Sequence, residues 1–529
     1  MAVYAYIDIS QKQEFIYRHN KLKVNLLNSY IIKKLTEDMG QQKFEAGPTL
    51  SLNKFLAEWD VHFVYSGGGN SIIRFPDKEL AMKFVNEYSL EVLKVYPEVE
   101  LYISTVDDAE YDAEDADRDQ KIRLSLLKKA DQLKDRRKAR FRRWSYGIEK
   151  IDETGKPVRL RSNEELNGEP DRAGAVNPIE RVDQEAAKAY LYRKWEQLTK
   201  QSSFETTDEL QEYRKDEQSK SYIGVIAIDG NQMGEMVRNT KTFEELGEFS
   251  SAIENIYFQA VQEALRSYPP EEKAKRFVTP VVMSGDDLCL IVRGESAVQI
   301  AANIVKQIQE ISKQMKHTSP LLSRVMTAPY LTACAGVAIV KVTYPFYDAI
   351  KAAERLCHQA KEQIHKALKE VSEEGQAAAS FIDWEIIHGQ AQAEPYDRYV
   401  KHRNEREVFH IKPLRIDQEQ AFQDGTYGFF PMIALAKQIE SDPDISSSLL
   451  EEVKKLSYKG RETYESYFHM KQDAKRLTEL VSRFFEGRSD KDFPIMQSEE
   501  DQSITYLLND LLGVLPFLGE KVEEVPNHD

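Results

Sequence analysis

Three aspartates stand where acidic side chains could hold divalent cations. Asp229 ends the apolar segment 222–228, and Asp286 and Asp287 lie in a tight turn between the apolar segments 277–283 and 288–292. If these segments are neighbouring strands, the carboxylates converge at one edge of a sheet, where they repel one another unless a cation is bound. Hard oxygen ligands select Mg²⁺ or Mn²⁺. Two such ions, about 3.5 to 4 Å apart, suit transfer of a nucleotidyl group from a triphosphate.

The same residues also fit a structural role. Aspartate is common in turns, so Asp229 could simply end a strand and Asp286 and Asp287 could form an ordinary polar turn. The apolar segments on both sides would place the acids against a core, and Gly285 leaves room for a ligand beside the backbone. On the residues alone, both interpretations stay open.

The elements around these acids occur twice along the chain, in the order strand, helix, two strands, helix, strand. The first set has strands at 2–9, 61–65, 71–75 and 101–106, with helices at 13–35 and 77–95. The second set has strands at 222–228, 277–283, 288–292 and 331–342, with helices at 243–268 and 296–316, followed by a helix at 347–369 and a strand at 380–387. This order is typical of the ferredoxin-like split arrangement.

Length and composition exclude several classes of protein. The 529 residues predict about three to four domains, and an apolar fraction of 41% excludes global disorder. The formal charge of −16 argues against a protein that coats nucleic acid or membranes nonspecifically. The three cysteines cannot form a disulfide framework or a four-thiolate zinc site. No segment is apolar enough to cross a bilayer, and we expect a cytoplasmic protein.

A charged segment separates the two sets of elements. Residues 107–119 contain eight acids, and residues 121–143 contain eleven Lys or Arg against two Asp. The basic part could be an arm that contacts RNA, with Phe141 and Trp144 as stacking surfaces, or an exposed helix docked on the acidic stretch. The arginines of the possible arm are Arg136, Arg137, Arg140, Arg142 and Arg143.

The motifs resemble a known family. YIGVIAIDGNQMGEM (222–236) and VVMSGDDLCLIV (281–292) resemble the catalytic palm of the large polymerase-like subunit of type III CRISPR effector complexes, which is related to GGDEF nucleotide cyclases. Residues 332–361 are similar to the closing segment of that palm, and residues 8–17 with 65–70 resemble the first, non-catalytic palm. The resemblance implies an α+β fold with two ferredoxin-like palms, a charged connector and an all-helical C-terminal domain. The expected domains are a first palm at 1–110, a connector without zinc ligands at 111–220, a catalytic palm at 221–395 and a helical domain at 396–529.

The resemblance also assigns roles to residues. It makes Asp229, Asp286 and Asp287 the metal-binding acids for two Mg²⁺ or Mn²⁺ ions. Lys361 would contact nucleotide phosphate, although it could equally be a solvated helix lysine. The turn of the first palm could bind a second nucleotide without catalysis, or could be a flexible hairpin. The remaining nucleotide-binding candidates are Gly67, Gly68, Gly69, Asn70, Ser284 and Gly285.

The sequence departs from the family pattern at several points. Ser284 replaces the first of two glycines in the catalytic turn, and Asn231 stands where the family often has a second aspartate. If a zinc-ribbon fold persists around 146–161, it does so without metal. The histidine-aspartate nuclease motif is not found before the first palm, and the only His-Asp pair is His528-Asp529. We therefore expect no DNA cleavage.

The implied function is synthesis of a cyclic or linear oligonucleotide messenger in antiviral defence. ATP is the expected substrate, while a cyclase using GTP stays open because the residues do not identify the base. The alternative is a catalytically silent scaffold that binds nucleotide or RNA within a type III CRISPR-like complex. Expected partners are nucleoside triphosphates and, within such a complex, guide-RNA subunits and target RNA; no membrane partner is expected.

Overall fold

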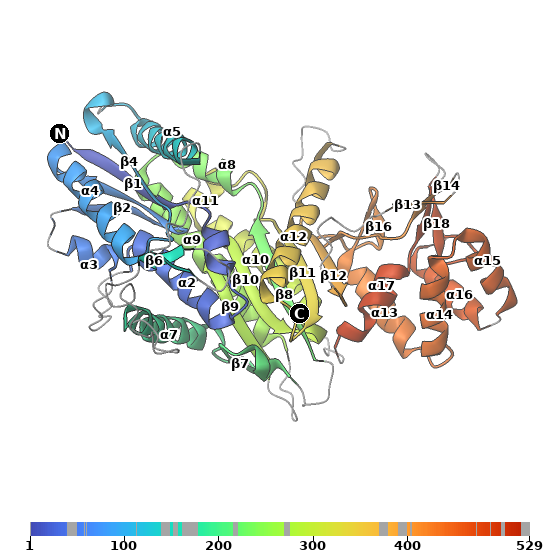
Figure 1. Cartoon of the computed structure of the whole chain (residues 1–529). Coiled ribbons are helices and arrows are strands. Elements are labelled where there is room, and N and C mark those ends of the chain that lie inside the picture. Colours follow the sequence, from blue (N-terminus) through green and yellow to red (C-terminus); the bar gives the residue numbers. More distant parts are fainter. Residues whose placement is uncertain are drawn as a thin grey trace, which may run out of the picture.

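The protein was analysed as a computed structural model of the full chain, drawn in Figure 1. The structure describes residues 2–39, 50–57, 59, 61–112, 114–138, 149–151, 157–160, 178–214, 221–268, 276–369, 379–389, 399–402, 405–471, 473–486, 488–498 and 503–519. The N-terminal, central and C-terminal parts follow one another along an elongated molecule (Figure 1).

The N-terminal part is a four-stranded antiparallel sheet with the strand order β2-β3-β1-β4. One face of β1 packs against α2 and α4, and the other packs against α5, because alternate residues of a strand point to opposite faces. Its strands are β1 (Val3–Ile9), β2 (His62–Gly67), β3 (Asn70–Phe75) and β4 (Leu101–Asp107). Its helices are α1 (Lys12–Tyr17), α2 (Leu22–Thr36), α3 (Leu52–Leu56), α4 (Lys78–Val95) and α5 (Arg118–Lys138).

The central part contains a seven-stranded sheet with the order β15-β12-β11-β8-β10-β9-β7. Its four middle strands repeat the order of the first sheet, so both predicted ferredoxin-like units are confirmed. The strands are β7 (Phe204–Thr206), β8 (Tyr222–Gly230), β9 (Arg276–Ser284), β10 (Asp287–Arg293), β11 (Ala333–Lys341), β12 (Phe381–Ile387) and β15 (Leu414–Arg415). The helices are α8 (Met233–Arg238), α9 (Phe243–Arg266), α10 (Gly294–Thr318), α11 (Pro320–Val325) and α12 (Phe346–Lys369).

The two units, called palm 1 and palm 2 below, match in register. In palm 1, Asp8 of β1 is paired with Asn70 of β3. In palm 2, Asp229 of β8 is paired with Asp287 of β10. The strand-end aspartate therefore occupies the same place in both palms, and the hairpin turns that follow can be compared position by position.

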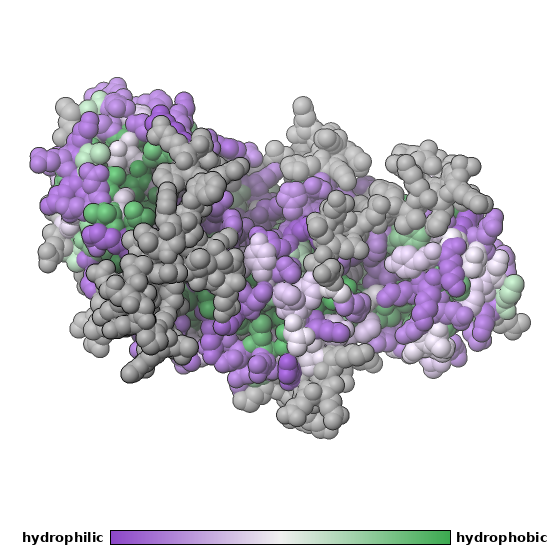
Figure 2. Space-filling view, in the orientation of Figure 1, coloured by the Kyte–Doolittle hydropathy of each residue, from purple (hydrophilic) through white to green (hydrophobic). Residues whose placement is uncertain are grey.

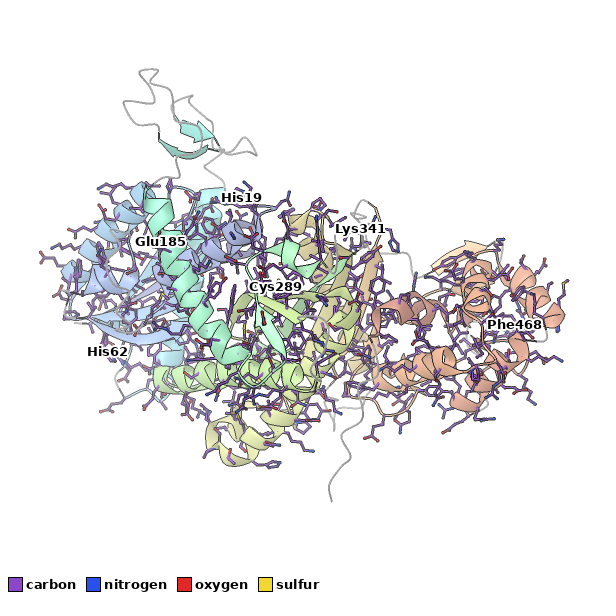
Figure 3. All side chains as sticks on the ribbon, turned by 90° about the horizontal axis from the view of Figure 1, so that it is seen from below. His19, His62, Glu185, Cys289, Lys341 and Phe468 are labelled. Carbon is purple, nitrogen blue, oxygen red and sulfur yellow. The ribbon has the colours of Figure 1, made fainter. Side chains whose placement is uncertain are left out.

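The palms share a hydrophobic core. One face of β8, with Ile226 and Ile228, packs against α9 and α10. The other face, with Val225, lies in a core that also contains α12 and the helices of palm 1. Burial on both faces explains why β8 is almost continuously apolar. Cys289 lies in the middle of this part of the molecule (Figure 3), and all three cysteines are buried and free.

The segment predicted as the connector contains two long helices, one in each half. The segment predicted as the start of the connector forms α5, which lies on β1 and β4 as part of palm 1. The hairpin of β5 (Glu149–Ile151) and β6 (Pro157–Leu160) stands away from the body in Figure 3. Helix α7 (Pro178–Leu198) contacts α2 of palm 1 and α9 of palm 2.

Helix α7 is fixed to palm 1 by a buried polar cluster. Lys34 of α2 pairs with Asp183 of α7, and both side chains are 2% exposed. The Tyr96 hydroxyl lies 2.5 Å from the Lys34 ammonium and donates a hydrogen bond of 2.5 Å to Asp183. Buried charges are tolerated because they are paired and hydrogen-bonded.

The C-terminal region is mostly helical, but it is not the all-helical domain that the sequence predicted. Its strands β13 (Tyr399–His402), β14 (Glu405–Val408), β19 (Ile504–Tyr506) and β18 (Ile495–Gln497) form a small sheet. The helices are α13 (Phe429–Ser441), α14 (Ser447–Ser457), α15 (Arg461–Met470), α16 (Ala474–Phe484) and α17 (Asn509–Val514). These strands are three or four residues long, too short for a period-two pattern to reveal.

The visible surface of the C-terminal helices is largely hydrophilic (Figure 2). Within the described ranges, none of the helices combines the length and the apolar composition that a membrane span requires.

Candidate functional site

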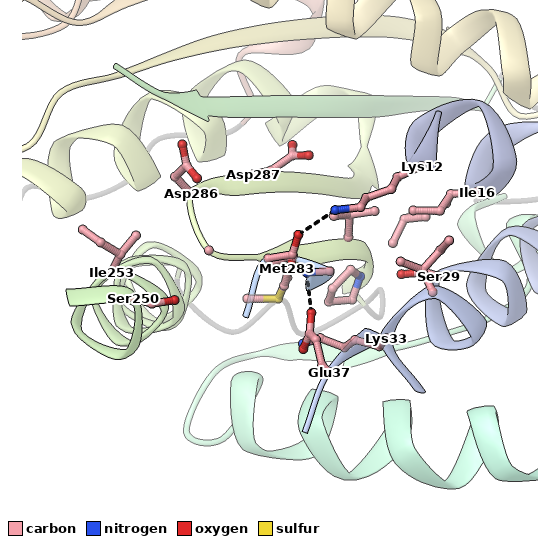
Figure 4. A pocket seen from close by; sticks show the side chains of 18 of the residues that line it. Lys12, Ile16, Ser29, Lys33, Glu37, Ser250, Ile253, Met283, Asp286 and Asp287 are labelled. Atoms are coloured by element: carbon pink, nitrogen blue, oxygen red, sulfur yellow. Dashed lines mark hydrogen bonds and ion pairs between the residues drawn. The ribbon is translucent and has the colours of Figure 1, made fainter. Parts of the chain in front are cut away.

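A cavity of about 290 Å³ lies between the two palms. Palm 1 lines it with Lys12, Glu37 and the glycine turn, palm 2 with the β9–β10 hairpin, and α7 and α9 complete the wall. In Figure 4, Asp286 and Asp287 rise from the same side of that hairpin, and Lys12, Lys33 and Glu37 of palm 1 lie across from it. Asp286 and Asp287 of palm 2 and the predicted turn of palm 1 thus line one cavity, and Asp229 adjoins it through its pairing with Asp287.

The three predicted acids are brought to one edge of the palm 2 sheet. Asp229 and Asp287 are direct cross-strand partners, and Asp286 occupies the turn beside them. A side chain at Gly230 would meet the Asp286 side chain at 2.9 Å, so these backbones are in close contact. Fifty-six residues lie between Asp229 and Asp286 in the sequence. The antiparallel pairing of β8 and β10 brings the two aspartates close together in the fold.

Burial and mutual repulsion make two of the acids hard to ionise. Burial, followed by the negative charge of Asp229, raises the pKa of Asp286 to about 6. Burial, followed by the charges of Asp229, Asp286 and Glu354, raises the pKa of Asp287 to about 7. Perturbed acids that gather in a cavity are a common signature of a functional site.

These pKa values predict a pH-dependent cost to stability in the absence of metal. A carboxyl whose pKa is higher in the folded than in the unfolded chain lowers stability as pH rises from about 4 to about 7. Asp287→Asn should therefore raise the free energy of unfolding by about 1 to 2 kcal/mol at pH 8 in EDTA. The gain should shrink as the pH is lowered towards 4.

Urea unfolding across this pH range measures the effect. Asp444→Asn, at an exposed site in the C-terminal region, is the matched control and should leave the curve unchanged. Loss of stability in Asp287→Asn at pH 8 would show that the ionised carboxylate is held by favourable contacts instead.

Lys361 reaches the site from α12. Its ammonium lies 2.5 Å from the carboxylate of Asp229 and donates a hydrogen bond of 2.9 Å to the Gly230 carbonyl. It is therefore not a freely solvated helix lysine in this structure. Its place beside the acids is compatible with the predicted phosphate contact, which stays a prediction.

The carboxylate oxygens of the three acids suit a divalent cation, but the acids are not arranged in this structure as a set of ligands around one ion. Among the described residues, no three His, Cys, Asp or Glu side chains are grouped closely enough to hold an ion. Asp229 is held by Lys361, so a cation shared by the three acids must compete with that ammonium. Buried carboxylates that repel each other favour such a cation. The two-ion site stays a prediction.

The departure at Asn231 has a structural explanation. The side-chain amide donates hydrogen bonds to the Thr332 hydroxyl (3.1 Å) and the Ala379 carbonyl (3.3 Å), and the residue is buried. A carboxylate could not donate to that carbonyl. Asn231 thus ties β8 to neighbouring segments. Ser284 lies at the last position of β9, in the wall of the cavity beside Gly285.

The predicted glycine turn of palm 1 is already hydrogen-bonded within the protein. The Gly69 amide donates to the Glu37 carboxylate (2.7 Å), and the Gly68 carbonyl accepts from Lys12 (3.2 Å) and Asn70 (3.4 Å). The Gly67 carbonyl accepts from the Tyr65 hydroxyl at 3.2 Å. A nucleotide at this turn would have to use side chains or displace these bonds.

Of the proposed RNA-contacting arginines, Arg136 lies in the described part of the chain with an exposed side chain, near the end of α5. Arg137 belongs to the same helix, but its side chain lies outside the described residues. Arg140, Arg142 and Arg143 lie outside them as well, as do Phe141, Trp144, His528 and Asp529.

Sequence reasoning missed several residues that surround the acids. Gln13 of palm 1 lies close enough to Asp287 to lower the pKa of that carboxyl, and Glu354 of α12 adds negative charge beside it. The buried Tyr257 hydroxyl points at the underside of the site, since a Cβ on Gly230 would lie 2.8 Å from it. These side chains come from distant elements, and no local motif marks them.

Several solved structures have a similar fold. The chain resembles a Csm1–Csm4 cassette in complex with cA3 (TM-score 0.53, 13% identity) and one in complex with AMPPNP (0.53, 12%). It also resembles Csm1 in T. onnurineus (0.50, 12%). Each of these matches covers 98% of this chain and 69% of the other. The chain spans 53% of the length of the matched chain in one Csm1–Csm4 cassette and 70% in another.

Among curated proteins, none matches the chain. The family model described as "Cas10/Cmr2, second palm domain" matches residues 222–368. This range contains the three acids, the β9–β10 hairpin and Lys361, so it coincides with palm 2 and confirms the resemblance found in the sequence. Residues 222–368 thus match the second palm domain of the Cas10/Cmr2 family, within a chain whose fold is similar to that of Csm1.

Proposed function

We propose that the protein is a metal-dependent nucleotidyltransferase that joins nucleoside triphosphates, with ATP as the expected substrate, into a cyclic or linear oligonucleotide. The observation that carries the proposal is the pairing of Asp229 with Asp287 beside Asp286, since Asp286 and Asp287 line one wall of a cavity whose other wall belongs to palm 1. The AMPPNP and cA3 complexes of proteins with this fold support a nucleotide as the ligand.

The reaction would place two nucleotides between the palms, one beside the palm 1 turn and one on the acids of palm 2. The 3′-hydroxyl of the first attacks the α-phosphorus of the second, a P–O bond forms, and pyrophosphate leaves. Asp229, Asp286 and Asp287 would hold Mg²⁺ or Mn²⁺, which when bound supplies charge neutralisation at the triphosphate and acidifies the hydroxyl.

The side chains of the protein mainly position the reactants. The Lys361 ammonium is paired with Asp229. When the acids bind a metal ion, a phosphate oxygen of the nucleotide can replace Asp229 as the partner of this ammonium. Gln13 links palm 1 directly to Asp287, so the geometry of the acid depends on the packing between the palms. The cavity of about 290 Å³ lies at the lower end of the usual range for small-molecule sites. We therefore expect the palms to adjust when two nucleotides bind.

Incubation of the purified protein with each labelled nucleoside triphosphate, in Mg²⁺ or Mn²⁺, tests the proposal. ATP should yield pyrophosphate and an oligonucleotide, separated by ion-exchange chromatography and identified by mass spectrometry. Product from GTP alone would replace ATP as the substrate while preserving the reaction class.

The competing function is a silent scaffold that binds nucleotide or RNA within a type III CRISPR-like complex. The ion pair between Lys361 and Asp229, which occupies one of the acids, favours this alternative. Absence of product from every triphosphate, with target RNA and partner subunits supplied, would establish the scaffold.

A further inference from the structure

The two palms carry opposite charge at equivalent positions. Because Asp8 pairs with Asn70 as Asp229 pairs with Asp287, Gly69 of palm 1 corresponds to Asp286 of palm 2. Palm 1 therefore keeps the strand-end aspartate and lacks the other two acids. The Lys12 ammonium lies over the turn where palm 2 has those acids, and Lys134 is the counterpart of Lys361.

Lys12 covers the glycine turn. Its ammonium lies 2.8 Å from Asp8 and donates to the Gly68 carbonyl at 3.2 Å. A Cβ at Gly69 would lie 3.2 Å from that ammonium and 3.3 Å from the two carbons before it. The absence of a side chain at Gly69 thus gives Lys12 the space to lie over the turn, where palm 2 has a carboxylate.

Lys134 completes the arrangement from α5. The Lys134 ammonium lies 2.7 Å from the second carboxylate oxygen of Asp8. Asp8 as a whole is buried, with 6% of its surface exposed. Helix α5 follows β4 as α12 follows β11, so Lys134 holds Asp8 as Lys361 holds Asp229. By formal charge, one aspartate with two lysines gives palm 1 a charge of +1, whereas three ionised aspartates with one lysine give palm 2 a charge of −2.

We propose that palm 1 binds a triphosphate on Lys12 without a divalent cation, an inference that rests on the proposed function because it concerns the second nucleotide of the same cavity. Lys12 lines the cavity and is partly exposed, so its ammonium can donate to phosphate oxygens while Asp8 and Lys134 hold it in place. Such charge-assisted hydrogen bonds are strong.

Neighbouring acids do not cancel the attraction of the Lys12 ammonium for phosphate. Glu37 is occupied by the Gly69 amide and lies 3.6 Å from Lys33, and Asp131 lies 3.6 Å from Lys134 on the solvent side of α5. The Lys12 ammonium, rather than the glycine amides, is therefore the expected phosphate ligand. Lys134 is a positioning residue, because it acts on phosphate only through Asp8.

Equilibrium binding of labelled ATP to the full chain in EDTA tests the inference. In EDTA the palm 2 acids repel a triphosphate, so one ATP should bind per chain, and Mg²⁺ should allow a second. Lys12→Met should weaken the EDTA-resistant binding by about 10-fold to 100-fold, whereas Lys12→Arg should retain most of it. Inorganic triphosphate should compete with ATP, since recognition is by phosphate.

Lys94→Met removes an exposed helix ammonium of the same palm and serves as the control, with unchanged binding expected. The inference is overturned if ATP binds only when Mg²⁺ is present, or if folded Lys12→Met binds ATP in EDTA as the unsubstituted protein does. Should Lys12→Met not fold, the EDTA result on the unsubstituted protein decides. Product formation is measured separately. A chain that forms no product can still bind one ATP in EDTA, which supports this inference without the proposed function. A chain that forms product but binds both nucleotides only with metal overturns this inference and leaves the proposed function standing.

Discussion

Asp286→Asn combined with Asp287→Asn should reduce product formation on the order of 1000-fold or more. The double variant keeps the shape of the β9–β10 turn but removes two of the three charges that would hold the metal ions. Loss of the groups that stabilise transition-state charge typically has effects of this size. Initial rates with saturating ATP and Mg²⁺ measure the change.

The matched control is Glu451→Gln with Glu452→Gln, a pair of consecutive acids on the exposed face of α14 that should leave the rate unchanged. Mg²⁺ should raise the melting temperature of the unsubstituted protein and of this control, but not of the aspartate variant. An aspartate variant with undiminished rate would remove these carboxylates from the reaction.

Gly336→Ala should be the most damaging single methyl group in palm 2. A Cβ at Gly336 of β11 would lie 2.1 Å from the Ala353 carbonyl oxygen and 2.2 Å from the Cys357 amide nitrogen of α12. Both obstacles are backbone, so the helix must move away from the sheet. The free energy of unfolding should fall by about 2 to 3 kcal/mol, as is typical of overpacking, and Lys361 should lose its register with Asp229.

Gly247→Ala is the control for this change. Gly247 lies in α9 with no neighbouring atom within 4 Å of its would-be Cβ. The same substitution there should stabilise the protein by about 0.5 to 1 kcal/mol, since alanine favours a helix. Urea unfolding of the two variants, read by circular dichroism, should therefore shift in opposite directions, and a shared direction would contradict the packing argument.

Much of the fold and the central acids could be predicted from the sequence. Strong apolar runs such as 222–228 and 288–292 fixed the strands, and their repeated order indicated two similar sheets. Asp229 and Asp287 could be placed together because each stands at the end of such a run. Pairing of strands in a sheet depends on local patterns and topology rules, which a sequence displays.

The surroundings of the acids could not be predicted in the same way. Gln13, Tyr257 and Lys134 reach their sites through tertiary packing of elements that are far apart in sequence. The basic segment gave no sign that Lys134 points inward, because its neighbours include many solvent-exposed charges. The first palm consequently extends into a segment whose composition suggested a connector, and the short C-terminal strands had too few residues for a pattern.

The buried polar cluster that fixes α7 to palm 1 has a consequence for how the cavity could open. The Lys34–Asp183 pair is buried, and removing one partner of such a pair costs about 3 to 5 kcal/mol. On its other side, α7 meets palm 2 through an ion pair between Lys194 and Glu254, whose glutamate is 49% exposed and which contributes about 1 kcal/mol or less. Leu198, at the C-terminal end of α7, is buried in the palm 2 core. Were the palms to separate, the N-terminal part of α7, which carries Asp183, would therefore stay with palm 1.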